Sequence, residues 1–148
     1  MIREHDSVIV RTGARMLVPP IQIFALYVVI HGHGSPGGGF QGGLILAASY
    51  ILIGLTLGRQ ELRRRAREGV LLALACLGVL VFALTGVATL ALGGALLDYT
   101  ALPFPGGGTA ARSLGILVIE IGVAIGVAGT LTLIFCRLAK AGEGEEAP

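Results

Sequence analysis

Three titratable side chains occupy unusual positions in this sequence. His31 and His33 directly follow an apolar run, and Glu120 is the only acidic residue strictly inside one. Imidazole titrates near neutral pH, and an acid within a membrane span usually marks an ion pathway. We therefore consider the three residues as candidates for a proton or cation relay. Their alternative roles are structural: two interfacial histidines in a tight turn, and a neutral carboxyl hydrogen-bonded across a subunit interface.

The sequence gives little support for nucleotide binding, metal binding or a cofactor site. Residues 32–37 carry the spacing G-x-G-x-x-G of a dinucleotide site, but that motif requires a preceding strand, and here an apolar run of helix length precedes it. Two histidines alone do not make a metal site. Cys76 and Cys136 both fall in apolar runs and have neither zinc nor iron–sulfur spacing. We expect no metal, no cofactor and no catalytic site in this chain.

The two histidines belong to a glycine-rich stretch, residues 31–43, in which seven of thirteen residues are glycine. Each glycine inside a helix lowers the stability of that helix by about 1 kcal/mol relative to alanine. Close packing of another backbone, or a bound ligand, must compensate for this loss. Ser35 followed by Pro36 is typical of a helix start. Glycines four residues apart then let neighbouring helices approach closely. The residues to which we assign this packing role are Pro36, Gly37, Gly38, Gly39, Phe40, Gln41, Gly42 and Gly43.

The elements that position these residues are membrane spans. With 54% hydrophobic residues, 14% charged residues and a mean hydropathy of +0.84, the 148-residue chain is not a water-soluble domain. We predict an all-α integral membrane protein, a single domain over residues 1–148 with four transmembrane helices. A kink or local break is expected near Val18, because Pro19 and Pro20 follow it. The approximate helices are 8–30, 36–57 (closing at Gly58), 70–94 (breaking at Gly93-Gly94) and 114–138 (capped by Ser113).

The basic residues predict the orientation. Alternating the loops between the two sides places ten basic residues on one side and only Arg112 on the other. The positive side is cytoplasmic, so both termini are expected in the cytoplasm. The tract 59–68 then faces anionic lipid, and nothing else in the sequence indicates nucleic acid.

The fourth span predicts how Glu120 is oriented. At about 100° per residue, Glu120 points about 140° away from a narrow glycine stripe on the same helix. The stripe is expected to pack one neighbour, while Glu120 meets a partner subunit or water, or remains protonated. The stripe consists of Gly115, Gly122, Gly126 and Gly129. The face around Glu120 is otherwise suited to lipid and consists of Leu117, Ala124, Val127 and Leu131.

The run GHGSPGGGFQGG at residues 32–43 resembles the signature of the MnhB/MrpB subunit of multisubunit, Mrp-type Na⁺/H⁺ antiporters. The likeness extends over about residues 6–138, including the lead-in DSVIVRTGARMLVPPIQIFALYVVIHGH. It implies a small, multi-pass subunit in the cell membrane of a prokaryote, packed against other membrane subunits. The complex would exchange a monovalent cation, Na⁺, for H⁺.

Two alternatives remain open. The same module occurs in membrane-bound hydrogenases and related respiratory complexes, where this chain would be an ion-translocation or anchor subunit. A homo-oligomeric scaffold held together by glycine faces is the third possibility. A self-contained carrier is disfavoured, because the sequence shows no convincing inverted repeat.

Overall fold

The computed structural model describes residues 8–32, 37–105 and 108–144. It contains α1 (Val8–His31), α2 (Gly39–Thr56), α3 (Arg59–Arg65), α4 (Glu68–Ala91), the 3₁₀ helix η2 (Tyr99–Ala101) and α5 (Gly108–Gly144). The described residues form no strand, and α1, α2, α4 and α5 are each long and apolar enough to cross a membrane. The predicted class, an all-α membrane protein with four spanning helices, is confirmed.

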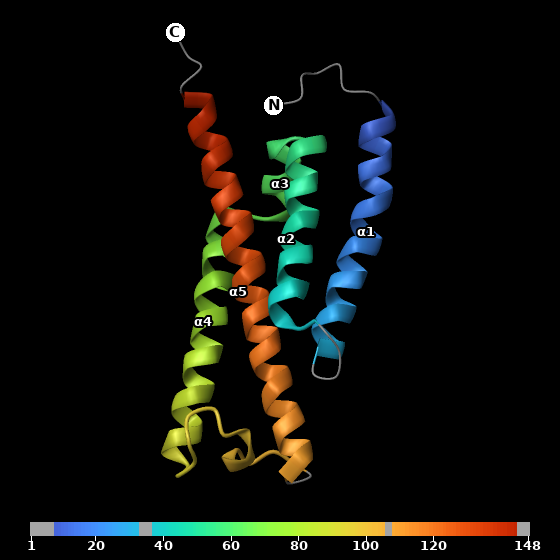
Figure 1. Cartoon of the computed structure of the whole chain (residues 1–148). Helices are drawn as coiled ribbons and strands as arrows, with labels where there is room; N and C mark the ends of the chain where they lie inside the picture. The colour runs from blue at the N-terminus through green and yellow to red at the C-terminus, as the bar shows by residue number, and fades with distance from the viewer. Residues whose placement is uncertain (1–7, 33–36, 106–107, 145–148) are drawn as a thin grey trace.

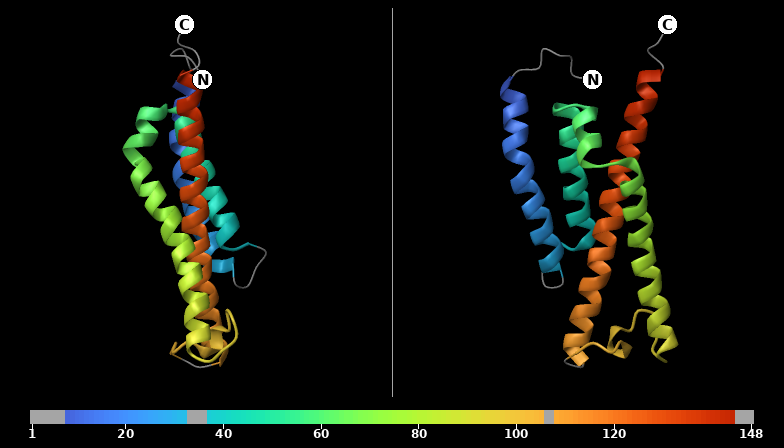
Figure 2. Two further views of the ribbon diagram at one scale, coloured as in Figure 1. Left: turned by 90° about the vertical axis from the view of Figure 1, so that its left-hand side faces the viewer. Right: turned by 180° about the vertical axis from the view of Figure 1, so that it is seen from behind.

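The long helix α5 lies between the other spans. It packs extensively against α4 on one side and α2 on the other, and α1 packs mainly against α2 (Figure 1). Along the length of the bundle, the end of α1 and the start of α2 lie well short of the level at which α4 ends and α5 begins, as both face-on views show (Figures 1 and 2). Gly39, the first residue of α2, meets α5 at Glu120, twelve residues after α5 begins. At 1.5 Å per residue the α1–α2 hairpin therefore stops about 18 Å short of the start of α5.

Glycines set the distances between the helices. A Cβ atom added to Gly78 of α4 would lie 2.5 Å from the carbonyl oxygen of Gly122 in α5. One added to Gly42 of α2 would lie 2.9 Å from the carbonyl oxygen of Ala25 in α1. Real Cβ atoms do not tolerate such distances, so these backbones touch only because the side chains are absent. The predicted close packing through glycines is confirmed.

Two helix starts differ from the prediction. The second span begins at Gly39 rather than at residue 36, because Gly38 is its N-cap, with φ of 123° that suits glycine. Ser35 and Pro36 lie outside the described residues. The fourth span runs over Gly108–Gly144 rather than 114–138, and Ser113 lies inside it instead of capping it. At about 55 Å, α5 exceeds the roughly 30 Å hydrocarbon core, so it extends beyond the membrane.

Other helix ends follow the expected turn chemistry. Gly58 has φ of 93° directly after the C-cap of α2, and Gly93 has φ of 83° where α4 ends. The break near Gly93-Gly94 is thus confirmed. In contrast, α1 continues through Pro19 and Pro20, so of the expected kink or local break near Val18, the break does not occur. Both prolines lie on the exposed side of α1, where their rings displace no neighbouring helix.

Candidate functional site: an acid against a glycine turn

Glu120 lies where α5 passes the connection between α1 and α2. A Cβ atom on Gly32 would lie 2.8 Å from both carboxylate oxygens of Glu120, and one on Gly38 would lie 3.2 Å from Oε1. A Cβ atom on Gly39 would overlap the main-chain carbonyl of Glu120. The carboxylate therefore rests directly on the peptide backbone of this connection. We call its described part, Gly32 and Gly37–Gly39, the glycine turn.

The glycine turn places Glu120 beside the N-terminus of α2. The first amides of a helix have no intrahelical acceptor and carry partial positive charge. The amide of Gly42 donates to the carbonyl of Gly38 at 2.9 Å and closes the first turn of α2, so the amides of Gly39, Phe40 and Gln41 have no acceptor within this helix. The Oε2 atom of Glu120 is buried from solvent. Burial disfavours the charged carboxylate and the helix terminus favours it, so the two effects oppose each other at this carboxyl group.

Sequence reasoning did not anticipate that the chain's own glycine turn would contact Glu120. The expected lipid-facing surface is wrong at two positions. Ala124 is buried, and a Cβ atom on Gly43 would lie 2.6 Å from the carbonyl oxygen of Ala124 and 3.0 Å from Val127. This face of α5 packs on α2 because both helices offer small residues there.

The glycine stripe of α5 packs as predicted, on the side away from Glu120. Gly122, Gly126 and Gly129 meet α4, and Gly115 meets the ring of Tyr99 in the connection after α4. The helical wheel thus separates the two surfaces of α5 correctly. One surface carries α4, and the other presents the carboxylate to the glycine turn.

The histidines are placed differently from each other. His31 ends α1, next to Gly32, and its ring stacks on Tyr27 with 4.2 Å between ring centroids. Its Nδ1 lies 3.1 Å from the carbonyl oxygen of Tyr27, which can only accept, so Nδ1 carries the proton in this contact. His33 lies outside the described residues. The structure therefore places one of the two predicted histidines within one residue of the glycine turn.

Two motif residues, Phe40 and Gln41, extend away from Glu120. Gln41 is exposed on the first turn of α2. Phe40 is 61% exposed and lines an apolar groove of about 400 Å³ between α2, α4 and α5. Gly78 and Gly126 lie in the same groove. Phe40 therefore contributes to the outer surface of the bundle rather than to its core.

Sequence reasoning missed a polar contact between α1 and α2. Gln22 Nε2 donates to Ser49 Oγ at 3.2 Å, and Ser49 donates in turn to the carbonyl of Leu46 at 2.7 Å. Ser49 and Thr132 are fully buried. Within the described part of the chain, Thr132 Oγ1 has no hydrogen-bond partner. These residues could have been noticed in the sequence, because Gln22, Ser49 and Thr132 are each a polar side chain inside an apolar run.

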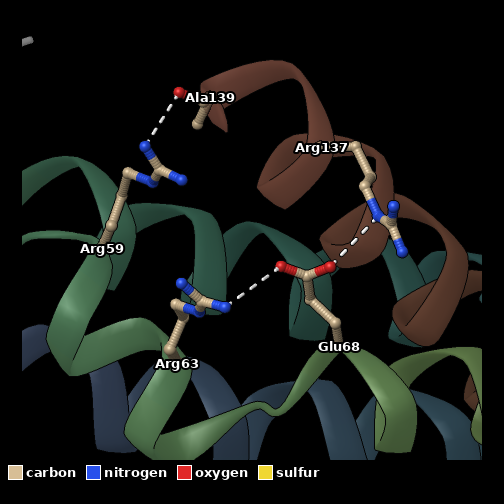
Figure 3. A network of polar contacts seen from close by, with 5 residues as sticks. All are labelled: Arg59, Arg63, Glu68, Arg137 and Ala139. Carbon is tan, nitrogen blue, oxygen red and sulfur yellow. Dashed lines mark hydrogen bonds and ion pairs between the residues drawn. The ribbon is translucent and has the colours of Figure 1, made fainter. Parts of the chain in front are cut away.

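A second missed feature closes the basic end of the bundle. Glu68, at the start of α4, forms two ion pairs. Its Oε2 lies 3.1 Å from Nε of Arg137 in α5, and its Oε1 lies 3.8 Å from a guanidinium nitrogen of Arg63 in α3. Arg59 donates to the carbonyl oxygen of Ala139 at 3.2 Å (Figure 3). These contacts tie α3 and α4 to α5. Across residues 8–32, 37–105 and 108–144, no group of three His, Cys, Asp or Glu residues could hold a metal ion.

Four helices that are long and apolar enough to cross a membrane define a small multi-pass membrane protein. Residues 9–133 match the family described as "Domain related to MnhB subunit of Na+/H+ antiporter". The chain belongs to this family, which confirms the resemblance seen in residues 32–43. It is therefore a subunit of the MnhB type, from a family of transporters rather than enzymes, and a multi-pass protein of a prokaryotic cell membrane.

Individual relatives agree with this assignment. The chain is 28% identical to a Na(+)/H(+) antiporter subunit of Bacillus subtilis (strain 168), over 87% of this chain and 95% of that protein. It is 40% identical to the putative antiporter subunit mnhB2 of Staphylococcus aureus (strain Newman), over 40% of this chain and 42% of that one.

Among solved structures, a chain of the membrane-bound sulfane sulfur reductase, an archaeal respiratory membrane complex, is similar, with a TM-score of 0.69 and 29% identity. The match covers 93% of this chain but only 60% of that one. Both kinds of relative belong to larger assemblies.

Proposed function

We propose that this chain is a subunit of a complex that exchanges Na⁺ for H⁺, and that Glu120 is a relay for the transported proton or cation. The observation that carries the proposal is the contact between the Glu120 carboxylate and the backbone of Gly32 and Gly38. A carboxylate beside a broken helical connection is the arrangement that membrane transporters use to bind small cations, with backbone carbonyls as the other ligands.

The position of Glu120 along the bundle fits this role. Gly122 of α5 contacts Val81 of α4, which fixes the level of Glu120 relative to α4. Glu68 lies about 20 Å from this level and Ala91 about 15 Å, at 1.5 Å per residue. Since α4 crosses the roughly 30 Å core between these ends, the Glu120 carboxylate and the glycine turn lie within the membrane.

The mechanism follows from the opposing effects on the carboxyl group. When Glu120 is deprotonated, the amides of α2 stabilise its charge, and a cation can bind to the carboxylate and nearby carbonyls. When it is protonated, burial stabilises the neutral form. We assign both termini to the cytoplasm, which puts the glycine turn and His31 toward the outer side of the bundle; the second histidine of the motif, His33, lies outside the described residues. The imidazoles then exchange protons between water and Glu120.

The test uses the full antiporter complex in everted vesicles from cells that lack other Na⁺/H⁺ antiporters. Na⁺-dependent collapse of the pH gradient is measured for Glu120→Gln and Glu120→Ala, with Glu61→Gln as the matched control at the exposed α3 pair. We expect Glu120→Gln to abolish exchange in an assembled complex and the control to behave as wild type. Normal exchange in Glu120→Gln, with assembly lost only in Glu120→Ala, would show that the carboxyl group is structural.

A second candidate is an ion-translocation or anchor subunit of a respiratory redox complex. The observation that favours it is the similarity to the archaeal sulfane sulfur reductase chain. The two candidates differ in the neighbouring subunits. Iron–sulfur absorbance in the purified complex, together with ion movement driven by reductant, would establish the second candidate. A colourless complex that exchanges cations without a reductant establishes the first.

A further inference from the structure

A basic cavity lies at the end of the bundle where α3 joins α2 to α4. It has a volume of about 570 Å³, and among the residues that the structure describes it is lined by Arg59, Gln60, Arg63, Arg64 and Arg67. Four guanidinium groups and one amide thus share a single concavity without an acidic residue. Like charges this close repel one another, so the arrangement favours a bound anion.

The fold builds this cavity by burying the other face of α3. Leu62 is 1% exposed and Ala66 is 5% exposed, and both belong to the core cluster with Ile53 and Leu71. The arginines of α3 must then point outward from the bundle. The α3 segment is therefore an amphipathic element fixed to the ends of two membrane spans, where lipid headgroups lie.

The arginines of the tract divide into two groups. Arg59 donates a hydrogen bond to the carbonyl oxygen of Ala139, and Arg63 faces the carboxylate of Glu68. Arg65 forms an ion pair with Glu61 at 2.8 Å. The guanidinium groups of Arg64 and Arg67 make no hydrogen bond or ion pair within the described residues, and both line the cavity. Two guanidinium forks are thus available in a concave site, and this geometry suits the oxygens of a phosphate group.

We propose that this cavity binds the phosphate of one anionic phospholipid headgroup, with Arg64 and Arg67 as its principal ligands. The site lies at the level of the headgroups, the cytoplasmic leaflet is rich in anionic lipid, and the adjoining ends of α2 and α5 expose the apolar side chains of Leu55 and Leu138. An acyl chain can lie on these side chains while the headgroup occupies the cavity. A free phosphate ion has no apolar part that could contact these side chains.

The test titrates the full-length chain with phosphatidylglycerol and follows bound lipid by native mass spectrometry. Arg64→Gln/Arg67→Gln removes two charges from the cavity. Arg65→Gln/Lys140→Gln removes two charges from the same end of the bundle outside the cavity, and is the matched control. We expect one tightly bound lipid in wild type and control, and at least about tenfold weaker binding in Arg64→Gln/Arg67→Gln, from the loss of two charge-assisted contacts. Circular dichroism verifies folding, and Arg67→Gln alone replaces the double variant if that does not fold.

Three outcomes would overturn the proposal. Equal weakening in both double variants would show diffuse attraction rather than a site. Displacement of the lipid by excess inorganic phosphate, or equal binding of phosphatidylcholine, would show that the cavity does not select an anionic lipid. A photo-crosslinking residue at Gln60, which also lines the cavity, reports on the intact complex. A crosslink to lipid supports the proposal, and a crosslink to another subunit refutes it.

Discussion

The α4–α5 contact makes a quantitative prediction, because its facing glycines are not equivalent. A Cβ atom on Gly78 would lie 2.5 Å from both the carbonyl oxygen of Gly122 and the Cα of Gly126. A Cβ atom on Gly126 would find its nearest neighbour, the Cα of Gly78, at 3.5 Å, which is ordinary contact. Gly78→Ala should therefore be destabilising and Gly126→Ala should not, although both add one methyl group to the same interface.

The magnitude follows from the atoms that must move. Both obstacles to a methyl group at Gly78 are main-chain atoms, so α4 and α5 would have to separate by roughly 1 Å, and such overpacking costs about 1–3 kcal/mol. Replacing glycine by alanine within a helix gives back about 1 kcal/mol at either position, and this gain cancels in the comparison. We expect Gly78→Ala to be less stable than Gly126→Ala by about 1–3 kcal/mol.

The chain provides its own reporter for this measurement. Cys136 is 6% exposed and Cys76 is exposed, so in a Cys76→Ala background only Cys136 reports unfolding. The reaction of Cys136 with a thiol dye, followed during titration with a denaturing detergent, gives the free energy of unfolding for each variant. Equal stabilities, or a greater loss in Gly126→Ala, would refute the idea that Gly78 sets the separation of these helices.

Three further predictions concern the turn, the topology and a loop. Gly38→Leu and Gly42→Leu should prevent assembly of the complex on native gels, whereas Gly13→Leu, where the space is open, should not. Single cysteines at the exposed residues Thr109 and Gln60 in a cysteine-free chain should react with an impermeant reagent from opposite sides, and reaction from one side would contradict the four-span topology. Hydrogen bonds from the Thr100 hydroxyl and amide lower the pKa of Asp98 below its ordinary value of 3.8. Its stabilising effect is therefore full above that value and lost as pH falls through the lower folded pKa, so the difference in melting temperature between wild type and Asp98→Asn should shrink in acid.

The number of spans could be predicted because each is an apolar run of sufficient length. Their ends could be predicted only where a glycine ends a helix, as at Gly58 and Gly93. At Ser113 the rule failed, because serine is also tolerated within a helix and the residues before it are good helix formers. The short helix α3 was missed because its four arginines indicate a solvated loop, whereas its burial depends on Leu62 and Ala66.

The site itself shows where sequence reasoning ends. The helical wheel gives the direction in which Glu120 points, and the motif marks residues 31–43 as unusual, but neither indicates that the two features meet. Their contact depends on the axial position of α2 against α5, and this position is set by Gly43 against Ala124 and Gly54 against Phe135. Such pairs are about eighty residues apart, and a helix can slide by a turn without altering its own amphipathic pattern.

That axial position also accounts for the concentration of glycine in the motif. A side chain at Gly32 or Gly38 would meet the carboxylate of Glu120, and one at Gly39 would meet its main chain. Alanine at these positions would therefore push the α1–α2 hairpin away from α5 and admit lipid or water between the turn and the acid. The glycines and Glu120 then act as one unit. The glycines remove the side chains that would separate acid and backbone, so the carboxyl group of Glu120 can lie beside the start of α2.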